Sequence, residues 1–145
     1  MTTIRPLTRA DEAGWRPLWR GYLEFYKAAL DKATTTKTFE RLVGDPRFFA
    51  FVADREGALV GVVHCIIHPA TWSIRDYCYL EDLFVQPVER GKGTGRALIE
   101  AVYSEARRRS LDRVYWLTHE TNAAGRALYG KLASFDGFIQ YRRKL

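Results

Sequence analysis

The sequence lacks several features that would assign it to a particular class of protein. It has only two cysteines, Cys65 and Cys78, and two thiols do not make a disulfide framework. Its longest apolar run, residues 58–67, falls well short of the roughly 20 residues that a membrane-spanning helix needs. No basic and apolar leader opens the chain, and no repeat or low-complexity tract interrupts it. These absences predict a cytoplasmic protein with one domain over residues 1–145 and no membrane partner.

Patterns typical of metal or nucleic-acid sites are also missing. His64 and His68 are four residues apart on an expected strand, so about 13 Å separates them, too far for one metal ion. No aromatic and basic signature of an RNA-binding sheet is present, and we expect neither a metal nor a nucleic acid. The net charge of +6 still favours an anionic partner, and charge alone does not choose between nucleic acid, a membrane surface and a phosphate-bearing cofactor.

What is present is an irregular succession of strand and helix patterns. Asp11 is expected to cap the first helix, and Asn122 or Thr121 the last one. Because strands come both before and after helices, the fold class is α/β or α+β with a mixed sheet. Strands are expected over residues 4–7, 49–54, 58–67, 77–85, 114–118 and 138–142, and helices over residues 12–29, 36–43, 97–106 and 123–132.

A glycine-rich loop lies between an expected strand and an expected helix. Glycines let the backbone approach an anion closely, and the start of a helix offers unpaired N–H groups and partial positive charge. Polyanionic phosphate is the expected guest, because three basic side chains add charge that can pair with phosphate oxygens. The loop consists of Arg90, Gly91, Lys92, Gly93, Thr94, Gly95 and Arg96.

Two familiar phosphate loops fit this segment less well. A P-loop requires Gly-Lys-Ser/Thr after four intervening residues, and here the Gly-Lys pair is followed by another glycine. A dinucleotide fingerprint requires Gly-x-Gly-x-x-Gly after an early strand, whereas these glycines are evenly spaced. A turn that binds nothing is the structural alternative, and it is disfavoured because three glycines cost backbone entropy without adding packing.

Several segments together resemble the GNAT superfamily of acyl-coenzyme-A transferases. The central motif of this family resembles residues 79–85, Pro87 and the glycine-rich loop. The core of that motif is (Arg/Gln)-x-x-Gly-x-(Gly/Ala), and residues 90, 93 and 95 match its three defined positions. Residues 4–6 with Asp11, and residues 122–129, resemble its first and last motifs. Residues 114–122 and 137–142 resemble the branch named after yeast histone and polyamine acetyltransferases, some of which are reported to act on D-amino acids.

This resemblance implies a mixed, mostly antiparallel sheet that is splayed between a parallel pair of strands, 77–85 and 114–118, with about four flanking helices. The pantetheine arm of acetyl-coenzyme A would lie in the opening, and its pyrophosphate would sit on the loop. A homodimer is a further expectation by analogy with the family. The arm would be held by main-chain groups of Leu83, Phe84 and Val85 and by Asn122.

The resemblance also implies direct transfer of an acetyl group to a primary amine. An alkyl amine is only about one part in 2,500 neutral at pH 7, so a base must accept a proton. Glu81 is predicted as that base, and Tyr129 as the acid that protonates the departing thiolate. The alternatives are a solvated carboxylate at 81 and a core aromatic at 129, and His119 is a rival base. Strand alternation places Asp82 on the face opposite Glu81.

The sequence gives fewer indications of where the amine substrate binds. Trp19, Tyr22 and Tyr26 on the first helix could wall an amine pocket, although such aromatics more often belong to a core. Glu120 is the predicted carboxylate partner, with Glu24 and Asp31 as further candidates. The favoured substrate is a small-molecule amine or amino acid. A protein lysine and a non-catalytic acyl-coenzyme-A sensor remain alternatives, and the presence of both Glu81 and Tyr129 favours an enzyme.

Overall fold

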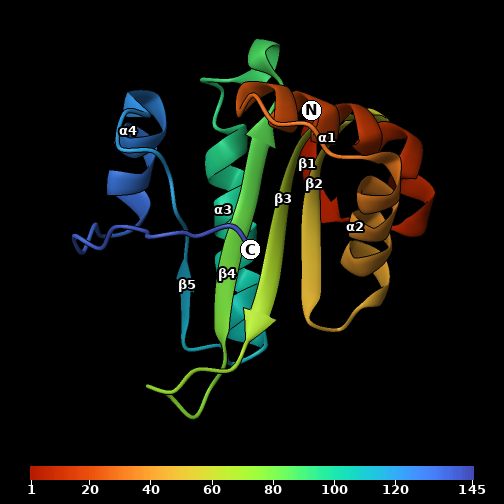
Figure 1. The fold of residues 1–145 in the computed structure, drawn as a ribbon. Coiled ribbons are helices and arrows are strands. Elements are labelled where there is room, and N and C mark those ends of the chain that lie inside the picture. Colours follow the sequence, from red (N-terminus) through yellow and green to blue (C-terminus); the bar gives the residue numbers. More distant parts are fainter.

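A five-stranded sheet organises the chain in the computed structural model, which describes residues 1–145 (Figure 1). Neighbouring strands are antiparallel except the last two, β4 and β5, which are parallel. The predicted mixed sheet and its parallel pair are therefore confirmed. In spatial as well as chain order, the strands are β1 (Thr2–Pro6), β2 (Phe48–Arg55), β3 (Ala58–His68), β4 (Tyr77–Val85) and β5 (Arg113–Tyr115).

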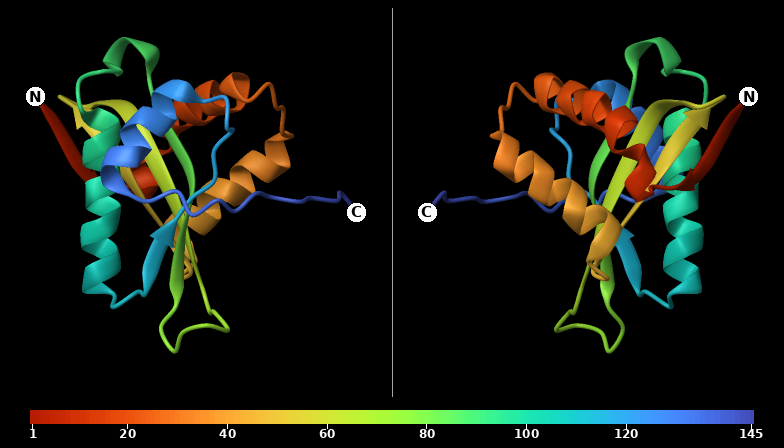
Figure 2. Two further views of the ribbon diagram at one scale, coloured as in Figure 1. Left: turned by 90° about the vertical axis from the view of Figure 1, so that its left-hand side faces the viewer. Right: turned by 90° about the vertical axis from the view of Figure 1, so that its right-hand side faces the viewer.

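Four helices flank the sheet, as predicted. The views in Figure 2 show α3 on one side of the sheet and α1 and α2 on the other, and α4 lies beyond β5 (Figure 1). No helix of the structure has the length and apolar character that a membrane crossing requires. The helices are α1 (Glu12–Phe25), α2 (Lys32–Gly44), α3 (Thr94–Arg108) and α4 (Ala123–Leu132), with short 3-10 turns at Arg9–Asp11 and Pro87–Glu89.

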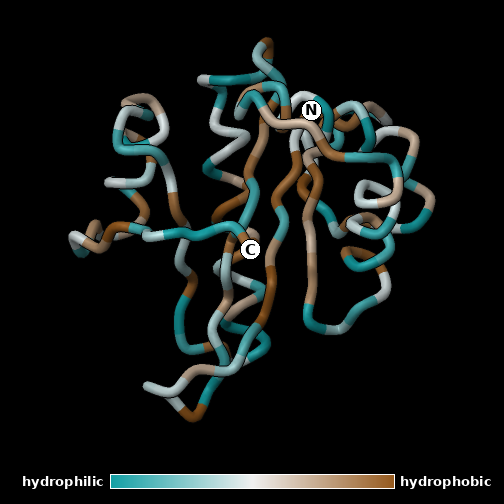
Figure 3. The backbone as a smooth tube through the Cα atoms, in the orientation of Figure 1, coloured by the Kyte–Doolittle hydropathy of each residue, from teal (hydrophilic) through white to brown (hydrophobic).

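Two apolar layers cover the two faces of the sheet. Beneath α3, the side chains of Leu98, Ile99 and Val102 are fully buried against the strands. Beneath α1 and α2, the second layer is built around Trp15 and Phe39. Because both of their faces are covered, the central strands β3 and β4 are hydrophobic over most of their length (Figure 3).

The caps of the first two helices differ from the prediction. Asp11 does not cap α1, because its carboxylate accepts the N–H of Thr8 at 2.8 Å and two bonds from the Arg5 guanidinium at 2.9 Å. The guanidinium beside Asp11 holds the pKa of that carboxyl well below its usual range. α2 begins four residues earlier than predicted, because Asp31 caps it by accepting the N–H of Thr34 at 2.7 Å.

The end of the chain forms no strand, so the strand predicted over residues 138–142 is wrong. β5 stops at Tyr115, three residues short of the predicted end, and leaves no partner ladder for a further strand. Residues 133–145 instead extend away from α4 to an exposed terminus (Figure 2). The side chains of Phe138 and Tyr141 are 82% and 90% exposed, which is unusual for residues this apolar.

Candidate functional site

The parallel strands β4 and β5 separate after three pairs of residues. Tyr77 to Tyr79 pair with Arg113 to Tyr115, and beyond Tyr79 the edge of β4 on this side has no partner strand. On its other side β4 remains paired with β3 as far as Val85. Main-chain groups of residues 80–85 therefore border an open edge, on which an extended ligand with amide groups can bond as an added strand. Leu83, Phe84 and Val85, the predicted partners of the pantetheine arm, lie on this segment.

The glycine-rich loop follows directly after the open edge. Gly91 and Gly93 have φ angles of 76° and 86°, a left-handed conformation that glycine adopts without strain, and Gly93 is the N-cap of α3. Among the main-chain hydrogen bonds, none is donated by an N–H group between Gly91 and Arg96. Six consecutive donors at a helix start thus remain for a ligand, an arrangement that fits a pyrophosphate.

Arg90 is held by the body of the protein. Its Nε donates to the carbonyl of Val85 at 2.9 Å, and its guanidinium lies over the rings of Phe25 and Phe84, 5.6 and 5.4 Å from their centroids. The side chain therefore braces the junction of β4, α1 and the loop. This contact was not visible in the sequence, which predicted only a phosphate partner at this position.

An ion pair between Arg55 and Glu89 holds the residue that precedes the loop. The carboxylate of Glu89 is only 7% exposed and accepts a 2.6 Å bond from Arg55 Nη1 at the end of β2. Lys92 Nζ lies 3.7 Å from the same carboxylate, and Arg96 Nε bonds Glu100 at 2.9 Å. Lys92 and Arg96 are both about half exposed, so these two side chains can exchange their partners for phosphate oxygens.

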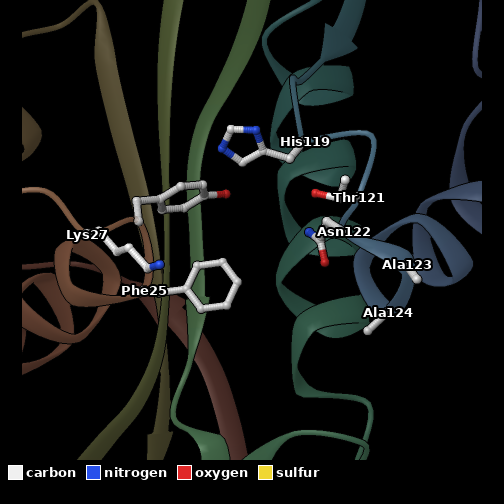
Figure 4. Close-up of a pocket in the computed structure, with 8 residues that line it drawn as sticks. Phe25, Lys27, His119, Thr121, Asn122, Ala123 and Ala124 are labelled. Atoms are coloured by element: carbon white, nitrogen blue, oxygen red, sulfur yellow. The ribbon is translucent and has the colours of Figure 1, made fainter.

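A cavity of about 560 Å³ lies between the end of α1 and the segment before α4. Phe25 and Lys27 face His119 and Asn122 across it, with Tyr26, Thr121, Ala123 and Ala124 completing the lining (Figure 4). Asn122 caps α4, since its Oδ1 accepts the N–H of Gly125 at 3.1 Å. The cavity therefore lies between the aromatic end of α1 and Asn122, the predicted partner of the pantetheine arm.

A β-bulge in β4 changes the geometry of the two carboxylates. His64 on β3 pairs with Asp82, but the next pair joins Cys65 to Leu80, so Glu81 has no partner. The extra residue breaks the alternation of side chains between the two faces. Tyr22 on α1 lies near both carboxylates: burial raises its pKa, and the charges of Asp82 and Glu81 raise it further. Strict alternation, on which the prediction of opposite faces for Glu81 and Asp82 depends, therefore does not hold at this point of β4.

The environment of Glu81 suits a proton acceptor. Its side chain reaches solvent, yet partial desolvation raises the pKa of its carboxyl above the ordinary value, and the negative charge of Asp82 raises it further. A carboxyl with a raised pKa is a stronger base than an ordinary glutamate. The sequence identified the residue but could not give this environment, because the environment depends on the bulge.

Tyr129, the predicted acid, lies on the inner side of α4. Its ring is half-buried and packs edge-on against Trp116, with 5.4 Å between centroids. Burial raises the pKa of its phenol, so the hydroxyl keeps its proton at neutral pH. The rival base His119 is exposed and lies 5.8 Å from the ring of Tyr26, whereas the side chain of Glu120 is exposed and lies outside the cavity lining.

The aromatic residues of α1 form a ladder that leads from the core to the cavity. Trp15 stacks on Trp19 and Trp19 on Tyr22, with centroids 5.8 and 5.4 Å apart, and Tyr26 follows at 4.9 Å. Trp19 is only 7% exposed, so it supports the ring of Tyr22. Tyr26 is 38% exposed and lines the cavity.

Comparison with known proteins decides the family. Residues 15–135 match the sequence family described as the acetyltransferase (GNAT) family. The chain belongs to the GNAT family of acetyltransferases. This GNAT chain is accordingly an acyltransferase, and acetyl-coenzyme A is its acetyl donor.

Relatives of this GNAT chain include enzymes with different acceptors. It is 34% identical over 144 residues to the D-amino-acid N-acetyltransferase HPA3 of Saccharomyces cerevisiae, covering 97% of this chain and 89% of that protein. Among solved structures, the aminoglycoside acetyltransferase AAC(6')-Iy with a bisubstrate analogue superposes with a TM-score of 0.88 at 18% identity, covering 100% and 99% of the two chains. The ribosomal-protein-alanine N-acetyltransferase of Brucella melitensis gives 0.85 at 24% identity, covering both chains fully. The two structures support the GNAT fold alone.

Proposed function

We propose that this chain transfers an acetyl group from acetyl-coenzyme A directly to the primary amine of a small molecule of the amino-acid type. The observation that carries the proposal is the pair of carboxylates, Glu81 and Asp82, at the bulge beside the open edge of β4, where the charges of both act on Tyr22. A substrate ammonium is attracted to such a pair. Lys27 adds a positive charge at the cavity, which suits the carboxylate of an amino acid. The D-amino-acid acceptor of the yeast relative supports the same class.

Different residues bind the donor and transfer the protons in the proposed reaction. Main-chain N–H groups of residues 91–96 hold the pyrophosphate, and the edge of β4 at Leu83 to Val85 orients the arm, with Asn122 opposite. Acetyl-coenzyme A supplies an acetyl group that is activated as a thioester. The carboxylate of Glu81 takes a proton from the substrate ammonium, directly or through a water, and leaves a neutral amine. Tyr129 holds a proton at Oη for the departing sulfur.

A panel of amines incubated with acetyl-coenzyme A, with release of free thiol as the signal, tests the proposal. The panel contains D- and L-amino acids, small alkyl amines, spermidine and a lysine-containing peptide. Turnover should be fastest with an amino acid or another small primary amine. Preference for the peptide would favour the protein-lysine alternative. Failure of every amine, with coenzyme binding intact in calorimetry, would contradict the proposal and favour a sensor.

Replacing Tyr129 by phenylalanine should lower kcat by about 10- to 100-fold, because the variant loses the phenol that supplies a proton to the leaving group. The KM for acetyl-coenzyme A should change little, since the ring and its packing on Trp116 remain. Steady-state kinetics measures both constants. Tyr103→Phe is the matched control, because this variant also removes a hydroxyl. The Tyr103 hydroxyl on α3 donates to the carbonyl of Leu132 at the end of α4, at 2.9 Å. Equal rates for the two variants would remove Tyr129 from the mechanism.

We further propose that the chain works in the cytoplasm as a homodimer. The two buried, unpaired cysteines suit a reducing compartment. The segment 133–145 exposes a row of apolar side chains, among them Phe135, Phe138 and Ile139 at 73–82%, which a second copy would cover. Sedimentation should give about twice the 16.7 kDa of one chain, and deletion of residues 134–145 should give monomers. A full-length monomer at tens of micromolar would contradict the dimer.

A further inference from the structure

A histidine that the reaction does not use lies buried behind the carboxylate pair. His64 on β3 is 2% exposed and lies beneath α1, beside the stacked rings of Trp15 and Trp19. Both of its ring nitrogens are engaged: Nε2 is 3.0 Å from the indole Nε1 of Trp15, and Nδ1 is 2.9 Å from Oδ2 of Asp82. The three side chains therefore form a hydrogen-bonded row from the core to the site.

The chemistry of the indole fixes the tautomer of this histidine. The indole nitrogen of Trp15 can only donate, so Nε2 of His64 must accept and carries no proton. Nδ1 then carries the proton of the neutral ring and donates it to the Asp82 carboxylate. A second proton on His64 would break the bond to Trp15 and place a charge in the apolar layer beneath α1, which is costly. His64 is thus held as a neutral donor.

The titratable groups that α1 and β4 bring to this row are phenols and carboxylates. The α1 side contributes Trp15, Trp19 and the phenols of Tyr22 and Tyr26. β2 contributes Ala50 opposite His64, and β4 contributes Glu81 and Asp82. Two neighbouring carboxylates whose charges act on each other would otherwise compete for a single proton. Donation from Nδ1 favours the ionised form of one of them only, Asp82.

We propose that His64 is a positioning residue that decides which of the two carboxylates exchanges the proton. It keeps Asp82 anionic and oriented, so that Glu81 alone accepts the proton of the substrate amine. Trp15 extends the arrangement by fixing the tautomer of His64. The role deepens the proposed acetyl transfer to amines and rests on it, although the charge states themselves do not depend on turnover.

Carboxyl ¹³C NMR of the free protein tests the charge states without any substrate. As the pH is lowered, Glu81 should take up its proton while Asp82 is still ionised. At neutral pH, His64 should show the ¹⁵N pattern of a neutral ring protonated at Nδ1. In Trp15→Phe, which leaves Nε2 without its donor, the tautomer protonated at Nε2 should also appear. Protonation of Asp82 before Glu81, or a His64 ring protonated at Nε2 in the unaltered chain, would overturn the proposal, whatever the substrate.

Kinetics of two substitutions then test the effect on the reaction. His64→Asn keeps an N–H donor close to the Nδ1 position, whereas His64→Leu removes it. The leucine variant should lose about 10- to 100-fold in kcat/KM for the amine and show a displaced acid limb in its pH profile, with the KM for acetyl-coenzyme A unchanged within about twofold. The asparagine variant should restore most of the rate. Identical pH profiles for the leucine variant and the unaltered chain would overturn the proposal.

Discussion

Substituting glutamine for Glu81 is expected to lower kcat by about 100-fold or more, the usual contribution of a positioned general base. The amide keeps the size and polarity of the side chain but cannot accept the proton of an ammonium. The KM for acetyl-coenzyme A should remain close to its original value, because the loop of residues 91–96 is untouched. Steady-state rates with the preferred amine, over a range of pH, provide the measurement.

The pH dependence has a definite sign. Glu81 must be ionised to act, so activity falls as the pH drops through its pKa, and its raised pKa places this loss at higher pH than an ordinary glutamate would. In Glu81→Gln this limb should disappear. Glu40→Gln, at an exposed position on α2, is the control and should leave both rate and profile unchanged. A limb that survives in Glu81→Gln would assign the base to another residue, with His119 the first to examine.

Substituting alanine for Gly93 is expected to weaken acetyl-coenzyme A binding by about 5- to 30-fold. Gly93 has a φ of 86°, and a side chain in this left-handed region costs about 1–2 kcal/mol, which corresponds to that loss of affinity when binding requires the conformation. Isothermal calorimetry with coenzyme A measures the change, and the KM for acetyl-coenzyme A should follow it.

The neighbouring glycine provides a matched control for the loop. Gly95 has no positive φ, and a methyl group there would meet Leu128 and Val85 at 3.7 and 3.8 Å, which is ordinary contact. Gly95→Ala should therefore bind coenzyme A as the unaltered chain does. Equal affinities for Gly93→Ala and the unaltered chain would mean that the pyrophosphate does not lie on this turn.

The sequence predicted the elements whose signals are local. β4 and α4 have the predicted bounds, because Pro87 follows the strand closely and Asn122 caps the helix. The strand expected over residues 138–142 has the right composition but no partner, and pairing is a property of the neighbour, not of the segment itself. The early start of α2 came from a capping signal at Asp31 that was read as a substrate carboxylate.

The site shows the same division between local and non-local information. The loop could be predicted from its glycines and charges alone. The relation of Glu81 to Asp82 could not, because a bulge appears only when one strand is set against another, and it reverses the face of every residue beyond it. The row from Trp15 to Asp82 and the packing of Arg90 on Phe25 also join distant segments, so the sequence could not show them.

The open edge of β4 has a consequence for the behaviour of the protein in concentrated solution. An unpaired strand edge is a template on which a foreign chain can add a strand and begin aggregation. Here the template is short, from Leu80 to Val85, and the side chain of Arg90 closes its end at the Val85 carbonyl. We expect a donor that binds along this edge, as proposed above, to protect it as well, so that the solubility of the enzyme rises with the concentration of acetyl-coenzyme A.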